Sequence, residues 1–207
     1  MKKFINKKLI LLDLDGVLIK SLKNMELAWK STTKKFSLNI KFVKYKRYIG
    51  IPFKDILKAL KIKKKLYHSI EKEFKKQSII NLEAITFYPG VLKTLKNLKK
   101  KYDVGVLTSK DNYRTKKILN KLNFKFDLIQ CPIPNLRGKP NLDLILKILD
   151  KIKKKKNEVI YVGDTKFDLM TCKAAKIDFI LAKYGYKIGI KNYKFSINKF
   201  KDLDNFF

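Results

Sequence analysis

The sequence has 207 residues, which suits one substantial domain or a core with a smaller insertion, and 45% of them are hydrophobic, which favours a folded chain over a disordered one. The net charge of +32 comes almost entirely from lysine, because arginine occurs only as Arg47, Arg114 and Arg137. Surfaces dedicated to nucleic acids rely on arginine, and the lysines are spread along the chain, so we interpret them as solvated surface and do not expect a nucleic-acid partner.

The first predicted element is a buried strand at residues 9–12. Leu9-Ile10-Leu11-Leu12 is a short apolar run between lysine and aspartate, which is typical of a parallel strand covered on both faces. The next stretch, from about Ser21 to Phe87, contains no convincing strand and shows helical patterns at residues 25–36, 53–60 and 66–79. This block is too long for an ordinary crossover, so we expect an inserted helical cap.

Strands and helices alternate from about Tyr88 to the end of the chain. Three helices are predicted, one after Pro89, one capped by Asp111 or Asn112, and one that starts near Asn141. Apolar runs between and after them predict strands at residues 104–107, 126–129, 159–162 and 179–181. This alternation is typical of an α/β fold with a parallel sheet.

Carboxylates follow two of the predicted strands, where ligands bind in open α/β sheets. Asp13 and Asp15 come directly after the first strand, and Gly16 then permits a sharp turn. Asp164 and Asp168 follow a later strand and stand one helical turn apart. Four clustered carboxylates repel one another, and a hard cation with oxygen ligands relieves that repulsion. We therefore expect a Mg²⁺ site.

Four short motifs in this order resemble those of the haloacid dehalogenase superfamily of phosphohydrolases. They are Asp13-Leu14-Asp15-Gly16-Val17, Leu107-Thr108-Ser109, Gly138-Lys139-Pro140 and Gly163-Asp164-Thr165-Lys166-Phe167-Asp168. Each motif alone is weak evidence, but their order and their placement at strand ends make a strong combination. The helical insertion between the first two is similar to the cap of the phosphoglycolate phosphatase-like and β-phosphoglucomutase-like branch.

This resemblance implies a fold and a domain organisation. The expected fold is a Rossmann-like three-layer α/β/α core with a parallel sheet, plus an inserted α-helical cap. The core would comprise residues 1–17 and 88–207, and the cap would comprise residues 18–87. One departure is the pair Lys20-Ser21, where this branch often has an acidic residue before the serine.

The resemblance also implies catalytic roles. Asp13 would attack phosphorus and form an aspartyl-phosphate, and Asp15 would act as general acid and then as general base. Thr108 would hydrogen-bond a phosphoryl oxygen, although Ser109 competes for that role. Lys139 would neutralise charge on the phosphoryl group and position Asp13.

The implied metal site uses four aspartates. Mg²⁺ would be bound by the side chains of Asp13 and Asp164 and by the backbone carbonyl of Asp15. Asp168 would hold Lys139 or a water bound to the metal. The substrate would contact Thr108 and Ser109 of the core.

The cap is expected to select the substrate. In similar proteins a glycine-containing cap loop reaches the active site, and Arg47 and Gly50 are the candidates here, with Arg47 contacting an anionic group. An ordinary turn between two helices explains the same residues equally well.

The leading hypothesis is a phosphatase that hydrolyses a small phosphorylated metabolite, such as phosphoglycolate or a sugar phosphate. Dehalogenases of the superfamily lack the second aspartate, so Asp15 favours phosphoryl transfer. A mutase of the β-phosphoglucomutase type and a basic nucleic-acid-binding protein on the same scaffold are the alternatives. A high positive charge would help to attract an anionic phosphate ester.

The cysteines and the apolar runs indicate the compartment. Cys131 and Cys172 lie far apart and form no metal-type or redox-type pair, so we expect a reducing, cytoplasmic environment. No apolar run is long enough to span a bilayer, so we expect no membrane partner. The chain would act as a monomer or a homodimer.

Overall fold

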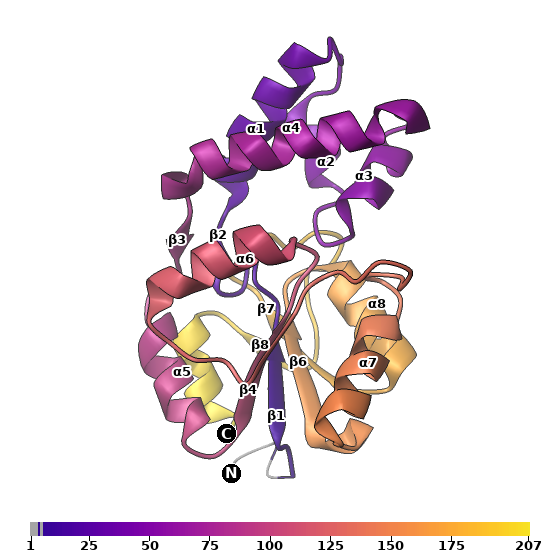
Figure 1. Ribbon diagram of the computed structural model, residues 1–207. Helices are drawn as coiled ribbons and strands as arrows, with labels where there is room; N and C mark the ends of the chain where they lie inside the picture. The colour runs from indigo at the N-terminus through magenta and orange to yellow at the C-terminus, as the bar shows by residue number, and fades with distance from the viewer. Residues whose placement is uncertain (1–3, 5) are drawn as a thin grey trace.

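The computed structural model describes residue 4 and residues 6–207 and shows a parallel sheet at its centre (Figure 1). Six strands pair in the order β5-β4-β1-β6-β7-β8, and every pair is parallel. Their bounds are β1 Leu9–Leu12, β4 Asp103–Leu107, β5 Leu128–Gln130, β6 Val159–Gly163, β7 Asp178–Ala182 and β8 Ser196–Ile197. The expected parallel-sheet α/β fold is therefore confirmed.

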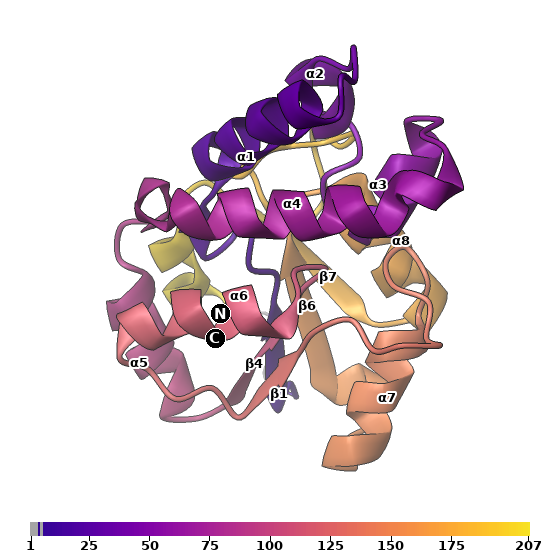
Figure 2. The same cartoon turned by 45° about the horizontal axis from the view of Figure 1, so that its top comes forward.

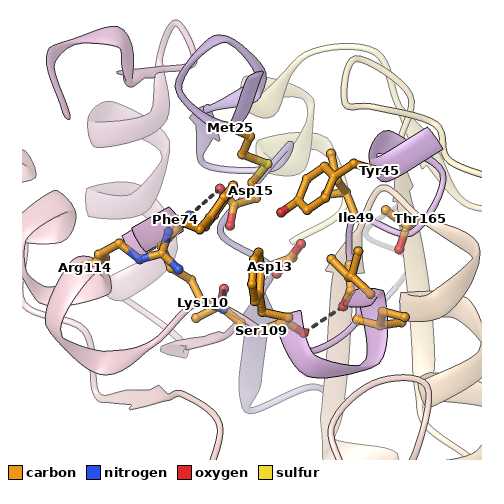
Figure 3. Close-up of a pocket in the computed structure, with 15 residues that line it drawn as sticks. Asp13, Asp15, Met25, Tyr45, Ile49, Phe74, Ser109, Lys110, Arg114 and Thr165 are labelled. Atoms are coloured by element: carbon orange, nitrogen blue, oxygen red, sulfur yellow. Dashed lines mark hydrogen bonds and ion pairs between the residues drawn. The ribbon is translucent and has the colours of Figure 1, made fainter. Parts of the chain in front are cut away.

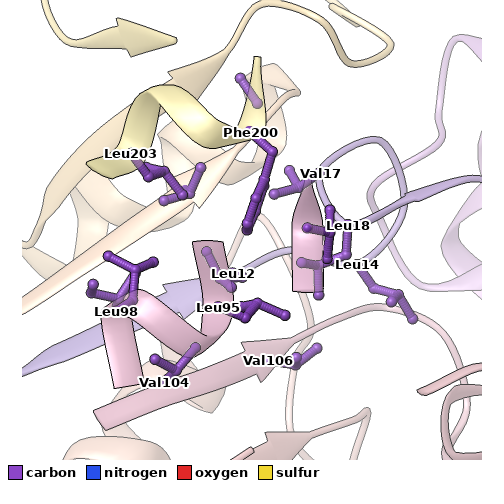
Figure 4. Close-up of a cluster of buried hydrophobic side chains, with 14 of the residues drawn as sticks. Leu12, Leu14, Val17, Leu18, Leu95, Leu98, Val104, Val106, Phe200 and Leu203 are labelled. Carbon is purple, nitrogen blue, oxygen red and sulfur yellow. The ribbon is translucent and has the colours of Figure 1, made fainter. Parts of the chain in front are cut away.

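Helices cover both faces of the sheet, because alternate residues of the central strand point to opposite sides. Ile10 and Leu12 pack into one apolar cluster, and Leu9 and Leu11 pack into another. The first cluster, part of which is shown in Figure 4, joins the sheet to helices α5 and α6 and to the 3-10 helix η5. The second joins it to α7 and α8. The bounds are α5 Val91–Lys99, α6 Asn112–Leu119, α7 Asp143–Ile152, α8 Lys166–Ala175 and η5 Phe200–Asn205.

The segment between β1 and β4 forms a separate helical layer above the carboxyl ends of the strands (Figures 1 and 2). Its own apolar cluster surrounds Trp29, whose ring is fully buried and lies 4.6 Å from that of Tyr45. Two short antiparallel strands, β2 and β3, connect this layer to the core. The bounds are β2 Ile19–Lys20, α1 Leu22–Lys35, α2 Phe42–Lys46, α3 Phe53–Ala59, α4 Tyr67–Ile80 and β3 Thr86–Phe87.

The structure adds elements to those expected from the sequence. The five predicted sheet strands and the three long cap helices are present, with ends shifted by up to three residues, and Asp111 does cap α6 by accepting from the Arg114 amide at 3.0 Å. The strands β2, β3 and β8 and the five-residue helix α2 were not predicted. Among the described residues, none of the helices combines the length and the apolar character that crossing a membrane requires.

Candidate active site

The four sequence motifs meet at one edge of the sheet. Asp13 follows β1, Thr108 follows β4 and Asp164 follows β6, and all three strands run in the same direction. Lys139 lies in the loop between β5 and α7. The carboxyl ends of neighbouring parallel strands lie together, so these side chains share one site beneath the helical layer.

Lys139 is the centre of a buried network. Its Nζ donates to Asp13 Oδ1 at 2.9 Å, to Asp168 Oδ1 at 2.7 Å and to the Tyr161 hydroxyl at 2.5 Å. Burial favours the neutral amine, but the two carboxylates outweigh it and raise the pKa of Lys139 above its usual value. Lys139 is therefore a fixed positive charge beside Asp13, as the resemblance implies.

Asp13 lies in a strongly desolvated environment and is only 3% exposed. Burial raises its pKa from 3.8 to about 7, although the nearby Lys139 charge works against this shift. Asp168 and Asp15 add repulsion between carboxylates. A cation beside Asp13 would favour its ionised form, which is the form that can act as a nucleophile.

Asp164 leaves a buried oxygen without a partner. Its Oδ2 accepts from the Tyr186 amide at 2.6 Å, but Oδ1 has no hydrogen-bond partner among the described residues. Asp13, Asp164 and Asp168 offer ligand oxygens that all lie within 4.8 Å of one another. A Cβ at Gly16, which has a positive φ of 86°, would lie 2.2 Å from Asp164 Oδ2. An orphaned carboxylate oxygen among hard oxygen donors fits Mg²⁺.

Asp168 is already fully engaged by protein donors. Its Oδ1 accepts from Lys139 at 2.7 Å and from the Tyr161 hydroxyl at 3.1 Å. Its Oδ2 accepts from the amides of Asp164 and Thr165 and from the Thr165 hydroxyl at 2.7 Å. These contacts favour the role of holding Lys139 and the start of α8 over that of a metal ligand.

The Asp15 side chain is held by partners of its own and does not join the group of Asp13, Asp164 and Asp168. Its Oδ1 accepts from the Ser21 hydroxyl and pairs with Lys110 Nζ at 3.1 Å, as Figure 3 shows for Lys110. The Tyr186 hydroxyl lies 2.8 Å from Ser21 Oγ and so supports the serine. This carboxylate is outside the group that could hold a metal, which leaves the Asp15 backbone carbonyl as its expected ligand atom.

The cap loop reaches the core through Gly50. The Gly50 carbonyl accepts from Ser109 Oγ at 2.7 Å, and a Cβ at Gly50 would approach Thr165 Oγ1 to 2.9 Å. Ser109 and Thr108 both line the pocket with Asp13, but the Ser109 hydroxyl is already used by the cap, and Thr108 is almost fully buried. Arg47 is exposed and does not line this pocket, so the structure does not bring it to the other candidates.

The pocket between cap and core is compact, with charged side chains on the core side and mostly apolar side chains on the cap side. Asp13 and Asp15 form its floor together with Thr108, and its volume is about 50 Å³. Lys110 and Arg114 lie on one side (Figure 3). The cap contributes Tyr45 and the apolar side chains Met25, Ile49, Phe53, Ile56 and Phe74.

Several residues of the site were not identified from the sequence. Lys110 and Arg114 line the pocket, Tyr161 holds Lys139, and Tyr186 contacts both Asp164 and Ser21. Lys110 follows directly after the second motif, and this position was the available signal for it. Tyr186 lies far from every motif, in the segment after β7, and no sequence pattern marks it.

The chain matches a known protein family over most of its length. The model for haloacid dehalogenase-like hydrolases matches residues 10–182. The phosphoglycolate phosphatase of Aquifex aeolicus (strain VF5) is 32% identical over 202 residues, which cover 95% of this chain and 94% of that protein. All four motifs lie within the matched region.

Solved structures show the same fold at lower identity. A hydrolase from Pseudomonas syringae superposes with a TM-score of 0.86 at 21% identity, covering 96% of this chain and 97% of the other. A haloacid dehalogenase-like family hydrolase from Streptococcus pneumoniae superposes with a TM-score of 0.83 at 20% identity, covering 97% and 98%. Both likenesses extend over the core and the helical layer alike.

Proposed function

Because this chain belongs to the haloacid dehalogenase-like hydrolases, we propose that it is a Mg²⁺-dependent phosphatase acting on a small phosphate ester through Asp13. The observation that carries the proposal is the position of Asp13. It lies on the floor of the pocket, bonded to a buried lysine, with Asp15 lining the same space.

The chemistry follows in two steps. An Asp13 carboxylate oxygen attacks phosphorus while the bond from phosphorus to the ester oxygen breaks, and Asp15 gives its proton to that oxygen. A water then attacks the aspartyl-phosphate, Asp15 takes the water proton, and Asp13 is released together with inorganic phosphate. Thr108 donates to a phosphoryl oxygen, and Lys139 balances the negative charge and fixes the Asp13 side chain.

The residues present fit a magnesium ion. The side chains of Asp13 and Asp164 and the backbone carbonyl of Asp15 would hold it, and the orphaned Asp164 Oδ1 supports this set. When bound, Mg²⁺ supplies positive charge that offsets the clustered carboxylates and the phosphoryl oxygens. Asp168 acts on the site through Lys139.

The compact pocket supports a small substrate. The pocket is lined by the cap as well as the core, so a bound ester would be covered by the cap, which suits a small ligand better than a nucleic-acid end. The name of the Aquifex relative makes 2-phosphoglycolate the first ester to test. The comparisons lend no support to the mutase or the nucleic-acid-binding alternative.

The test is phosphate release from a panel of small phosphate esters, with and without Mg²⁺, for the wild type and Asp13→Asn. We expect turnover that requires Mg²⁺ and falls at least about 1,000-fold in Asp13→Asn, because the nucleophile is lost. Thermal unfolding of both proteins controls for folding. Equal turnover by folded Asp13→Asn would contradict the assignment of Asp13 as nucleophile.

A further inference from the structure

Two buried cations line the pocket next to Asp15, and the proposed two-step chemistry uses neither of them. Lys110, the residue before the N-cap of α6, is 5% exposed, and Arg114, in the first turn of α6, is 6% exposed. Lys110 pairs with Asp15 at 3.1 Å. Figure 3 shows both cations on the same side of the pocket, opposite Tyr45.

Arg114 is held in place, but part of the hydrogen-bonding capacity of its guanidinium group is unused. Its Nε donates to Asp111 Oδ2 at 2.6 Å, and its guanidinium carbon lies 5.6 Å from the centre of the Phe74 ring. Its two terminal nitrogens have no hydrogen-bond partner in the part of the chain that the structure describes, yet they are not sealed from the pocket. A guanidinium fixed through Nε and its ring contact leaves a fork suited to a carboxylate or phosphate.

The two cations also repel each other. Both are buried and line the same side of one pocket, where little water screens their like charges. An anion between the two would relieve this repulsion, in the same way that a cation relieves a cluster of carboxylates.

The rest of the pocket offers an anion little else. The cap side is formed by Met25, Ile49, Phe53, Ile56 and Phe74, which are apolar, and by the Tyr45 hydroxyl, which points into the pocket (Figure 3). Lys139 is engaged by Asp13 and Asp168 on the floor. A second negative group on the substrate is therefore best accommodated at Lys110 and Arg114.

We infer that Lys110 and Arg114 form a subsite for an anionic leaving group, so that this site selects short phosphate esters or anhydrides with a carboxylate or phosphate next to the scissile oxygen. The inference rests on the proposed function and deepens it. In this inference, residues of the core bind the second negative group of the substrate, whereas the sequence suggests Arg47 of the cap for that role.

A purely structural role for Arg114 is the rival explanation. Arg114 pairs with the residue that caps α6 and packs against Phe74 of the cap, so its loss could loosen the whole site. Such loosening would lower activity on every substrate by a similar factor. A subsite would lower activity only on substrates that carry the second charge.

The test compares kcat/KM for three substrates in the Mg²⁺-loaded enzyme. 2-Phosphoglycolate supplies a carboxylate, pyrophosphate supplies a phosphate, and propyl phosphate has a neutral leaving group of similar size. The variants are Arg114→Gln and, as a matched control, Lys116→Gln, which removes one charge from an exposed position of the same helix. The readout is the ratio of each anionic substrate to propyl phosphate within one protein, so a partial loss of folded enzyme cancels.

We expect the wild type to favour an anionic substrate by at least about 100-fold, and Arg114→Gln to reduce that ratio about 10- to 100-fold, as for a lost hydrogen bond between charged groups. Lys116→Gln should keep the wild-type ratio. The better of the two anionic substrates identifies the group that the subsite takes. A wild-type ratio near 1, or a ratio unchanged in Arg114→Gln, would overturn the inference while leaving the phosphatase intact.

Measurements of ligand binding test this inference independently of the proposed function. If the wild type hydrolyses neither these three compounds nor any other ester of the panel, the proposed function fails, and calorimetry with phosphonoacetate and propylphosphonate then tests the subsite by itself. Tighter binding of phosphonoacetate to the wild type, lost in Arg114→Gln, supports the subsite. Equal binding of the two compounds refutes it.

Discussion

The pKa of Asp13 predicts an unusual dependence of stability on pH in the metal-free protein. Burial raises this pKa from 3.8 to about 7, so between these values the folded state binds a proton that the unfolded chain releases. Stability from this group is therefore complete below pH 3.8 and is lost as the pH rises through about 7. A tenfold change in proton affinity is worth about 1.4 kcal/mol, so the loss approaches about 4 kcal/mol.

Asp13→Asn removes the titrating group and is the matched variant. Urea unfolding of EDTA-treated protein at pH 5, 6, 7 and 8 should show a fall in the unfolding free energy of the wild type relative to Asp13→Asn. Mg²⁺ should flatten the wild-type curve, because a bound cation favours the ionised carboxylate. Parallel curves for the two metal-free proteins would show that the Asp13 pKa is not raised, and the reasoning from burial would fail.

Two further substitutions test the site. Lys139→Met should lower the free energy of unfolding by about 3–5 kcal/mol in urea titrations, because Asp13 and Asp168 lose their buried counterion, and an unchanged midpoint would contradict the network. Gly16→Ala should weaken Mg²⁺ binding at least about tenfold by calorimetry, because its Cβ would meet Asp164 Oδ2 at 2.2 Å. Gly90→Ala is the control, since its φ is similarly positive but its nearest neighbour is 3.8 Å away, and equal affinity in both variants would refute the steric argument.

The sequence predicted the features that depend on local patterns. A short apolar run such as Leu9–Leu12 is typical of a parallel strand that is covered on both faces, and the structure places it at the centre of the sheet. Once the strands are parallel, residues that follow them must share one edge, which is why Asp13, Thr108 and Asp164 come together. The parallel sheet and the location of the site therefore follow from the short apolar runs and from the polar residues that end them.

Features that depend on tertiary contacts could not be predicted in the same way. β8 has two residues, and its pairing with β7 is set by the packing of the C-terminal segment and not by its own composition. Arg47 stands three residues before Gly50, yet the helical end that carries it leaves its side chain exposed while Gly50 reaches Ser109. Residues that are close in sequence have neighbouring backbone positions, but the direction in which each side chain points depends on the packing of the whole cap.

The lysine content shows how structure separates functional charge from abundant charge. In a chain with a net charge of +32, the described residues include few buried cations, namely Lys7, Lys110, Arg114 and Lys139. Lys7 pairs with Asp178 at the other end of the sheet, and the remaining three surround Asp13 and Asp15. Burying a charge is expensive unless it has a partner, so a buried cation persists where an anion compensates it. Lys139 finds that compensation within the protein, whereas Arg114 retains unused donors that face the pocket. Burial combined with unmet hydrogen-bonding capacity, and not the number of lysines, therefore indicates where an anionic substrate binds.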